Sequence, residues 1–234
     1  MSVMRFRRPR TSAGGDTVTV QVALRSALRD VIGPAARAHG FQGSAPNWRK
    51  VSDRGDWAIV NVQSSRYSSA ESLRCVVNLS LAPEPWLAWT VATRGPLPKQ
   101  LPESYGMYRK RLLPTVTPSG VDGWWEVNHP DEAPGVVADI ARQLGETGWP
   151  TLERLLDRQS MLDQVRAGDL GFVQREHHGV LVAWAHALLV SDHGPSDELD
   201  EQLAYALQHT TDSQREDDLR FDAWVRRRAE SARP

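Results

Sequence analysis

Two polar segments of this sequence carry the side chains best suited to bind a ligand. The first, Gln63-Ser64-Ser65-Arg66-Tyr67, interrupts a stretch with the composition of a β-strand, and the second is Asn78, in the next such stretch. Amide and guanidinium groups are planar and form hydrogen bonds in a fixed geometry, which suits a carboxylate or a phosphate. We therefore expect Arg66 to clamp an anionic group while Gln63 and Asn78 form hydrogen bonds to it.

Two adjacent tryptophans, Trp124 and Trp125, are expected to supply an aromatic wall, so that the pocket lies between the sheet and this pair. The complete set of predicted ligand-binding residues is Gln63, Ser64, Arg66, Tyr67, Asn78, Asp122, Trp124 and Trp125. The ligand is expected to be a partner protein or a small anionic molecule.

A structural role for the same cluster is the main alternative. Side chains alternate along a strand, so Gln63 and Ser65 face one side while Ser64 and Arg66 face the other, unless the strand bulges. Gln63, Arg66 and Asn78 could then satisfy backbone groups and acidic partners where the sheet ends, because buried polar groups must be paired.

The residue types of a hydrolase are also present, and a small-molecule enzyme that uses the same pocket is the second hypothesis. Ser64 or Ser65 could act as nucleophile, His39 or His129 as base, and Asp122 as the acid that orients it. The sequence contains no Gly-x-Ser-x-Gly elbow and no glycine-rich phosphate loop before a helix. We therefore assign no catalytic residue and favour a non-enzymatic binding or protein-interaction module.

Histidines are frequent in the last third of the chain, at His177, His178, His186 and His193. Their spacing does not match the His-Glu-x-x-His pattern that places two imidazoles on one helix face. We therefore expect histidines on solvated helix faces, no bound metal and no cofactor.

The charge balance argues against nucleic acid as a partner. The chain has 28 basic and 29 acidic residues and a formal net charge of −1, so it creates no overall attractive field. Arginine clusters occur at 5–10, 109–111 and 226–228, but the last is explained by the end of a helix. A nucleic-acid-associated protein is therefore the third hypothesis.

Cysteine use and hydropathy indicate the compartment. The single cysteine, Cys75, lies in an apolar run and is expected to be a buried, inert thiol, which fits a reducing environment. No segment approaches the roughly 18 to 20 apolar residues of a membrane-spanning helix. We expect a cytoplasmic protein that makes no membrane contact, and the sequence leaves its oligomeric state open.

The elements that must position the site alternate between helix and strand. Asp16 is expected to cap a helix whose apolar residues Val20, Leu24, Leu28 and Val31 recur every three or four positions. Strands are expected at 47–52, 57–64, 73–81 and 86–93, with short connections that favour an antiparallel meander. A helix at 105–113, a short strand at 124–127 and a helix that starts at Asp131 follow.

Strand patterns disappear after Pro150, and helical segments are expected at 151–167, 172–190, 196–209 and 212–232. The predicted organisation is a flexible basic tail at 1–15, an α+β domain at 16–149 and an all-helical C-terminal extension at 150–234. In the α+β domain an N-terminal helix packs on an antiparallel sheet of four to five strands, and the extension forms a helical bundle.

Several motifs of the first domain also occur in this order and spacing in a known family. They are Phe41, Trp48, the stretch from Val60 to Ser69 that includes Gln63-Ser64-Ser65-Arg66, the triplet Val77-Asn78-Leu79, and Asp122-Gly123-Trp124-Trp125. This pattern resembles the bacterial family known as domain of unknown function 4304, over about residues 20–145. The resemblance implies an α+β domain of bacterial origin. It implies no activity and no catalytic residues, because the family has none assigned.

Overall fold

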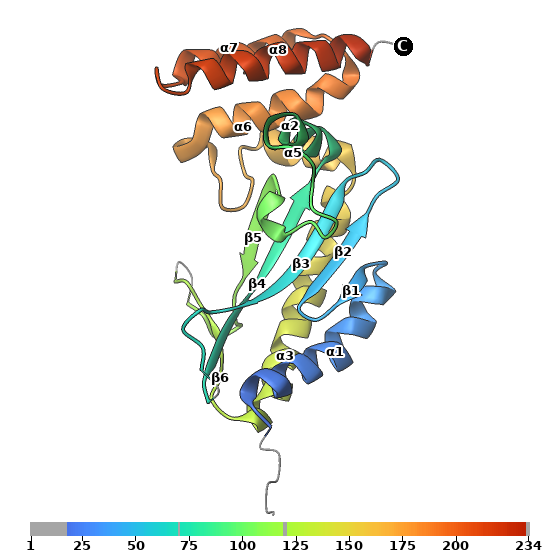
Figure 1. The fold of residues 1–234 in the computed structure, drawn as a ribbon, viewed down its shortest axis with the longest axis vertical. Coiled ribbons are helices and arrows are strands. Elements are labelled where there is room, and N and C mark those ends of the chain that lie inside the picture. The colour runs from blue at the N-terminus through green and yellow to red at the C-terminus, as the bar shows by residue number, and fades with distance from the viewer. Residues whose placement is uncertain (1–17, 70, 119–120, 233–234) are drawn as a thin grey trace, which may run out of the picture.

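A computed structural model describes residues 18–69, 71–118 and 121–232. The predicted basic tail at 1–15 and the predicted helix cap Asp16 lie outside the described residues. The α+β class is confirmed, with an N-terminal helix, an antiparallel sheet and a helical C-terminal region (Figure 1).

The described residues form one antiparallel sheet of six strands in the order β1-β2-β3-β4-β5, with β6 paired to the far end of β4. The strands are β1 (Gln42–Ser44), β2 (Asn47–Val51), β3 (Trp57–Ser64), β4 (Leu73–Ala82), β5 (Tyr108–Leu112) and β6 (Trp125–Val127). The central strand β4 is long enough to pair with β3 along one side and with β5 and β6 along the other. The first strand, β1, was not predicted.

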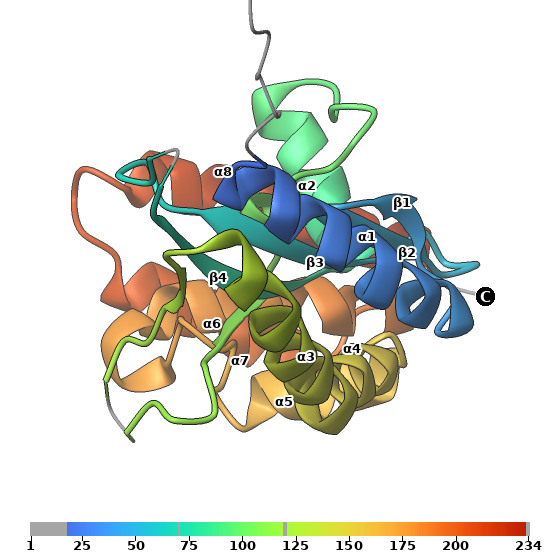
Figure 2. The ribbon, with the colours of Figure 1, turned by 90° about the horizontal axis from the view of Figure 1, so that it is seen from below.

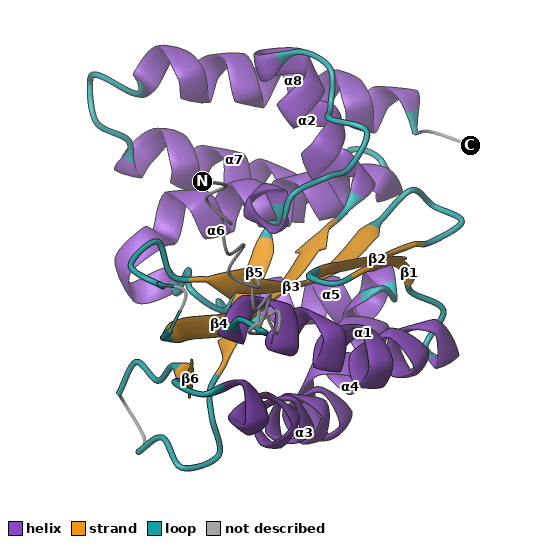
Figure 3. Ribbon diagram, turned by 60° about the horizontal axis from the view of Figure 1, so that its bottom comes forward, coloured by secondary structure: helices purple, strands orange, loops and turns teal. Residues whose placement is uncertain are grey.

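The two faces of the sheet have different covers. On the first, the α1 face, Val60, Cys75 and Val77 join a large apolar core with α1 (Val20–Ala38) and α3 (Ala133–Gln143). On the second, the α2 face, Ile59 and Ala82 pack with Leu87 and Leu101 beneath α2 (Glu84–Arg94). Figures 2 and 3 show α2 on the opposite side of the sheet from α3 and α4.

Helix α1 follows the predicted periodicity with one shift. Thr19 is the N-cap and accepts a hydrogen bond from the Val22 amide, and the helix continues through Pro34. Val31, predicted as apolar contact, is 44% exposed, and Ile32 is fully buried instead. The helix therefore presents Ile32 to the sheet, four residues after Leu28, as the 3.6-residue period requires.

Two predicted elements are wrong in type. The segment predicted as a strand at 86–93 is α2, because Pro83 and Pro85 start a helix and side chains on several sides of it are buried, including Leu87 and Trp89. The segment predicted as a helix at 105–113 contains β5, in which Tyr108 and Leu112 are buried. Tertiary pairing with β4 overrides the helix-forming composition of its basic residues.

Beyond β6 the described chain is helical. Helix α3 begins at Ala133, not at the predicted Asp131, which lies in the short 3₁₀ turn Pro130–Glu132 that precedes it. Helix α3 continues through a π-helical segment, Leu144–Gly148, into α4 (Trp149–Leu155), so the predicted boundary at 149 lies within a helical stretch. The remaining helices are α5 (Arg158–Arg166), α6 (Arg175–Val190), α7 (Asp197–His209) and α8 (Arg215–Ser231).

The helix predicted at 151–167 is in fact two helices. Asp157 ends the first and caps the second, because its carboxylate accepts a hydrogen bond from the Ser160 amide. Helices α6, α7 and α8 stack in a layer at one end of the sheet (Figure 1, top).

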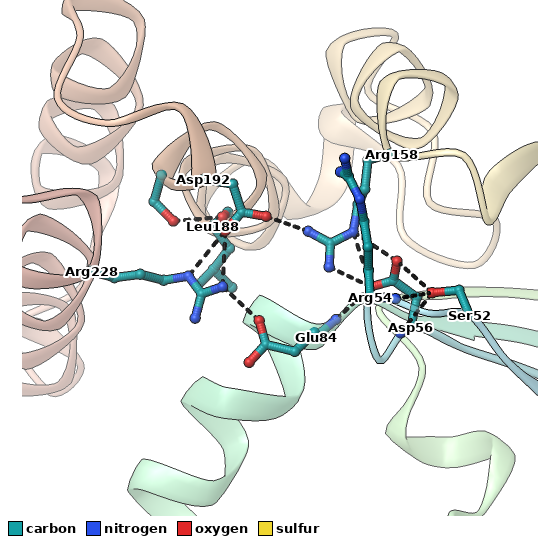
Figure 4. A network of polar contacts seen from close by, with 9 residues as sticks. Ser52, Arg54, Asp56, Glu84, Arg158, Leu188, Asp192 and Arg228 are labelled. Atoms are coloured by element: carbon teal, nitrogen blue, oxygen red, sulfur yellow. Dashed lines mark hydrogen bonds and ion pairs between the residues drawn. The ribbon is translucent and has the colours of Figure 1, made fainter. Parts of the chain in front are cut away.

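A buried network of ion pairs joins this helical layer to the sheet (Figure 4). Asp56, in the turn between β2 and β3, is 1% exposed and accepts hydrogen bonds from the Glu84 amide at 2.8 Å and from Arg158 Nε at 2.9 Å. Arg158 Nη1 also donates to Asp192 at 2.5 Å. Arg228 of α8 donates to Asp192 at 2.9 Å and to Glu84 at 2.6 Å. One carboxylate thus links the sheet, the start of α2 and α5.

The helical region also adds a short segment to the free edge of β5. The Arg109 amide donates to the carbonyl of Leu170 at 3.0 Å, and the Phe172 amide donates to the carbonyl of Arg109 at 2.8 Å. Gly171 lies between these bonds with a φ of +81°, and a Cβ there would be 1.9 Å from the Arg109 carbonyl oxygen. Only glycine therefore allows this close approach of the two backbones.

We expect Asp56→Ala to lower the free energy of unfolding by about 3–5 kcal/mol, because it leaves Arg158 buried without its main partner. Urea unfolding followed by circular dichroism measures this loss. Asp53→Ala is the matched control, since Asp53 lies exposed in the same turn, and we expect it to change stability by less than about 0.5 kcal/mol. Equal effects of the two substitutions would contradict a central role for Asp56.

Candidate functional site

A row of polar side chains crosses the α2 face of the sheet, beyond the part that α2 covers. Asn47, Asn61, Asn78 and Arg111 lie directly opposite one another in β2, β3, β4 and β5. Asn61 is two residues from Ile59, which packs beneath α2, so all four side chains lie on the α2 face. We call these four residues the polar row.

Hydrogen bonds between amide groups connect the row. Asn61 Nδ2 donates to Asn47 Oδ1 at 2.7 Å. Asn78 Nδ2 donates to Asn61 Oδ1 at 3.3 Å and to Gln63 Oε1 at 2.9 Å. Asn78 is buried, whereas Gln63 is exposed. Because Gln63 uses its oxygen toward Asn78, its amino group remains as a donor that faces outward.

Gln63 and Ser64 also line a cavity of about 320 Å³, which we call the amide cavity. It lies beyond the first residue of β2, where β3 forms an open edge of the sheet. Its other wall is formed by residues of α1, including Gln21 and Arg25. Arg25 is exposed and has no ion pair or side-chain hydrogen bond with any other described residue. The cavity is therefore lined by residues that carry a guanidinium group, an amide and a hydroxyl, and the guanidinium group has no partner among the described residues.

The opposite end of the polar row is a separate cluster around Arg111. Its Nη1 donates to Asp122 at 2.8 Å, and its guanidinium carbon lies 5.5 Å from the centroid of the Trp124 ring and 5.8 Å from that of Phe172. These contacts hold the guanidinium group in place by a cation–π attraction on two rings. Asp122 and Trp124 therefore lie together around Arg111, and their role in ligand binding stays a prediction.

Trp125 lies on the other face of the sheet. It is 3% exposed, pairs with Cys75 in β4, and donates from Nε1 to Asp139 at 2.8 Å. The two tryptophans therefore point to opposite faces and are not neighbouring walls of one pocket, because side chains alternate along a strand.

Arg66 and Tyr67 lie in the exposed connection that follows β3. Arg66 Nη2 donates to the Tyr67 hydroxyl at 2.7 Å, and its guanidinium carbon is 4.8 Å from the Tyr67 ring centroid. Tyr67 is 80% exposed. Among the described residues, Arg66 makes no hydrogen bond to Gln63 or Asn78, so it is not part of the hydrogen-bonded polar row.

The predicted set of ligand-binding residues does not include Asn47, Asn61 and Arg111 of the polar row, nor Arg25. Asn47 and Asn61 occupy ordinary half-exposed strand positions, and only the strand register shows that they face Asn78. Arg25 lies on the helix predicted to cover the sheet, and its proximity to Gln63 is a tertiary contact that no sequence spacing encodes. The asparagines could have been found as polar residues in strand segments, at even spacing from Gln63.

The candidate bases lie apart from the serines. His39 Nδ1 is 2.7 Å from a carboxylate oxygen of Glu153, and its ring stacks on Trp149 at 5.3 Å. His129 Nδ1 is 2.5 Å from Asp131. Among the described residues, neither histidine makes a hydrogen bond to a serine.

Several other charged clusters have partners within the described chain. Arg109 pairs with Glu103, and Arg226 pairs with Asp200 and Asp222. The arginines at 5–10 lie outside the described residues. In the part of the chain that the structure describes, no group of three or more His, Cys, Asp or Glu side chains is arranged to hold a metal ion.

The contact between Trp125 and Asp139 makes stability depend on pH. Burial raises the pKa of Asp139. Hydrogen bonds from Thr115 and Trp125 and the charge of Arg142 lower the pKa by more than burial raises it, so the pKa lies below the usual value of 3.8. A lowered folded pKa stabilises the fold above the unfolded pKa, and this stability is lost as the pH falls through the folded value.

We therefore expect Asp139→Asn to lower the free energy of unfolding at pH 7 by about 1–3 kcal/mol, and to cost progressively less below pH 3.8. Urea unfolding across a pH series measures this difference. Asp131→Asn, at an exposed carboxylate, is the control. A destabilisation that is constant from neutral to strongly acidic pH would be inconsistent with the assigned role of Asp139.

The thiol of Cys75 is confirmed as buried, and burial raises its pKa to about 12. A thiol reagent attacks the thiolate, so we expect Cys75 to be unreactive toward a disulfide reagent at pH 8 in the folded protein. One equivalent of thiol should react once urea unfolds the chain. Rapid reaction of the folded protein would show that this core opens locally.

Comparison with known families identifies the domain that carries the polar row. A family model described as "Domain of unknown function (DUF4304)" matches residues 32–154, which is more than half of the chain and includes every strand of the sheet. Comparisons with curated proteins and with solved structures found no match. The chain therefore belongs to the DUF4304 family, as the motifs around Gln63, Asn78 and Trp124 indicated.

Proposed function

We propose that this protein is a non-enzymatic binding module that holds an anionic group, a carboxylate or a phosphate, in the amide cavity. The group belongs to a small molecule or to an acidic segment of a partner protein. The observation that supports this most is that Arg25, Gln63 and Ser64 line one cavity, and that Arg25 has no ion pair or side-chain hydrogen bond with another described residue. Such a set of donors suits an acceptor-rich anion.

The polar row prepares Gln63 for this role. Asn78 donates to Asn61 and to Gln63, and Asn61 donates to Asn47. Gln63 is therefore held in one orientation before a ligand arrives, with its amino group toward solvent. Preorganised donors bind more tightly because less side-chain entropy is lost on binding.

The cavity size supports a small ligand group. A volume of about 320 Å³ is at the lower end of the range that binds small molecules. Arg66 and Tyr67, in the connection that follows Ser64, extend this site as an exposed rim in our proposal. Trp124 and Asp122 fix the other end of the polar row through Arg111.

We also propose that the protein acts in the cytoplasm. Its only cysteine is a buried free thiol, which suits a reducing compartment. In the described residues, no helix combines the length and apolar character that crossing a membrane requires.

The test is an NMR titration of the full chain with succinate and with inorganic phosphate. We expect the side-chain amide signals of Gln63 and the Nε signal of Arg25 to shift together on addition of at least one probe. Arg25→Gln should weaken that binding about tenfold or more, because a charge-assisted hydrogen bond contributes about 1.5–3 kcal/mol.

Two matched substitutions serve as controls. Arg29→Gln removes a guanidinium group one turn further along α1, where it is paired with Asp30, and should leave the affinity unchanged. Arg66→Gln tests the anchor predicted from the sequence alone. Loss of binding in Arg66→Gln but not in Arg25→Gln would move the anchor to the rim, and equal affinity in all variants would refute the site.

Capture from a cell lysate distinguishes the sources of the anion. A protein that binds the wild type but not Arg25→Gln indicates an acidic segment of a partner. Recovery of nucleic acid would favour the third hypothesis from the sequence. Turnover of an ester or amide substrate that depends on Ser64 would favour the enzyme hypothesis and overturn the non-enzymatic proposal.

A further inference from the structure

A second cavity lies in the helical layer, far along the chain from the amide cavity. Its volume is about 570 Å³, and it lies between the start of α6, the end of α7 and the start of α8. These three helix ends meet on one side of the layer, near the loop that joins α7 to α8 (Figure 1, upper left). We call it the helical cavity; its walls include His177, Trp184, Tyr205, His209, Asp217 and Asp218.

A buried carboxylate in the wall of this cavity has no hydrogen-bond partner among the described residues. Asp218 is 3% exposed, and neither of its carboxylate oxygens has a hydrogen-bond partner among the described residues. Asp218 lies in the first turn of α8, where the helix dipole favours a negative charge, but no backbone amide donates to its side chain. Burying a charged group without a partner costs several kcal/mol, so such a group is a candidate for contact with a ligand.

Aromatic rings form the other walls. Tyr205 stacks on His209 at 4.0 Å, and Trp184 stacks on Phe221 at 4.1 Å. The Tyr205 ring lies close to α6 because residue 179 is glycine, where a Cβ would be 2.4 Å from the Tyr205 hydroxyl. The faces of tryptophan and tyrosine rings attract ammonium and guanidinium groups.

We propose that the helical cavity binds an organic cation, an ammonium or guanidinium group, through the Asp218 carboxylate and the rings of Trp184 and Tyr205. The cation supplies the hydrogen-bond donors and the positive charge that Asp218 lacks. Asp217, exposed beside it and paired with Arg220, adds negative charge near the opening. This site is independent of the amide cavity, and neither proposal depends on the other.

The histidines beside the helical cavity are not arranged as a metal-binding cluster in the described residues. His177 and His178 have ring centroids 6.4 Å apart in an edge-to-face arrangement, and α6 is interrupted at His178 by non-helical backbone angles. No cluster of metal-binding side chains occurs in this or any other described part of the chain. An organic cation fits both the carboxylate and the aromatic walls.

The test is isothermal titration calorimetry of the full chain with three probes. Agmatine carries a guanidinium group, cadaverine carries only ammonium groups, and a blocked Gly-Gly-Arg-Gly-Gly peptide presents the guanidinium group as a protein would. Hexanol is the neutral control. We expect at least one cationic probe to bind and hexanol not to bind measurably.

Variants then assign the site. Asp218→Asn should weaken the binding about tenfold or more without lowering the melting temperature, because its carboxylate makes no hydrogen bond in the described residues. Tyr205→Leu keeps the charge and should weaken the binding about threefold. Glu216→Gln, at an exposed acid on the same helix outside the cavity lining, should leave the affinity unchanged.

Some outcomes identify the source of the cation, and others overturn the proposal. Binding of agmatine or cadaverine without the peptide indicates a free amine, and tighter binding of the peptide indicates a side chain of a partner protein. Wild-type affinity in Asp218→Asn would overturn the proposal. So would the absence of binding by all three cationic probes at millimolar concentration.

Discussion

The carboxylate of Asp56 is the point on which the arrangement of the sheet and helices depends. It lies in a tight turn of the sheet, yet it accepts hydrogen bonds from the first amide of α2 and from the guanidinium group of Arg158 in α5. Through Arg158, Asp192 and Arg228, the same set of charges reaches α8. Two buried charges are costly in isolation, so their strict pairing favours one relative position of these elements.

This constraint determines which part of the sheet is left for binding. Asp56 fixes the position at which α2 starts. Helix α2 therefore covers Ile59 and Ala82 at one end of the sheet and leaves Asn61 and Asn78 uncovered by its apolar residues. The segment around Gly171 meanwhile extends the β5 edge and brings Phe172 against Arg111. The helical region therefore shapes the polar row from outside the sheet, although it lies almost entirely beyond the matched family domain.

The predictions from the sequence succeeded where a local pattern is decisive. Helix α1 was found from its period. Gln63 and Asn78 were chosen because polar residues in apolar strands are conspicuous, and the structure shows that they are hydrogen-bonded to each other, while their role in ligand binding stays a prediction. Trp86 to Thr93 was assigned to the wrong element because large and β-branched side chains favour a strand locally, whereas burial on several sides of α2 and the Asp56 cap decide the outcome. Arg25 and Asp218 could not be found, because their significance is a missing partner, and a missing partner is visible only when the neighbours are placed in space.

The presence or absence of a partner distinguishes the charged residues that stabilise this fold from those proposed to bind ligands. Asp56, Arg158 and Arg228 all form ion pairs, and these pairs hold the helices to the sheet. Among the described residues, the exposed Arg25 and the buried Asp218 both lack an ion-pair or side-chain hydrogen-bond partner. An exposed unpaired arginine costs the fold little, since water solvates it. A buried unpaired carboxylate is costly, and it is therefore the stronger of the two indications that a ligand completes the structure.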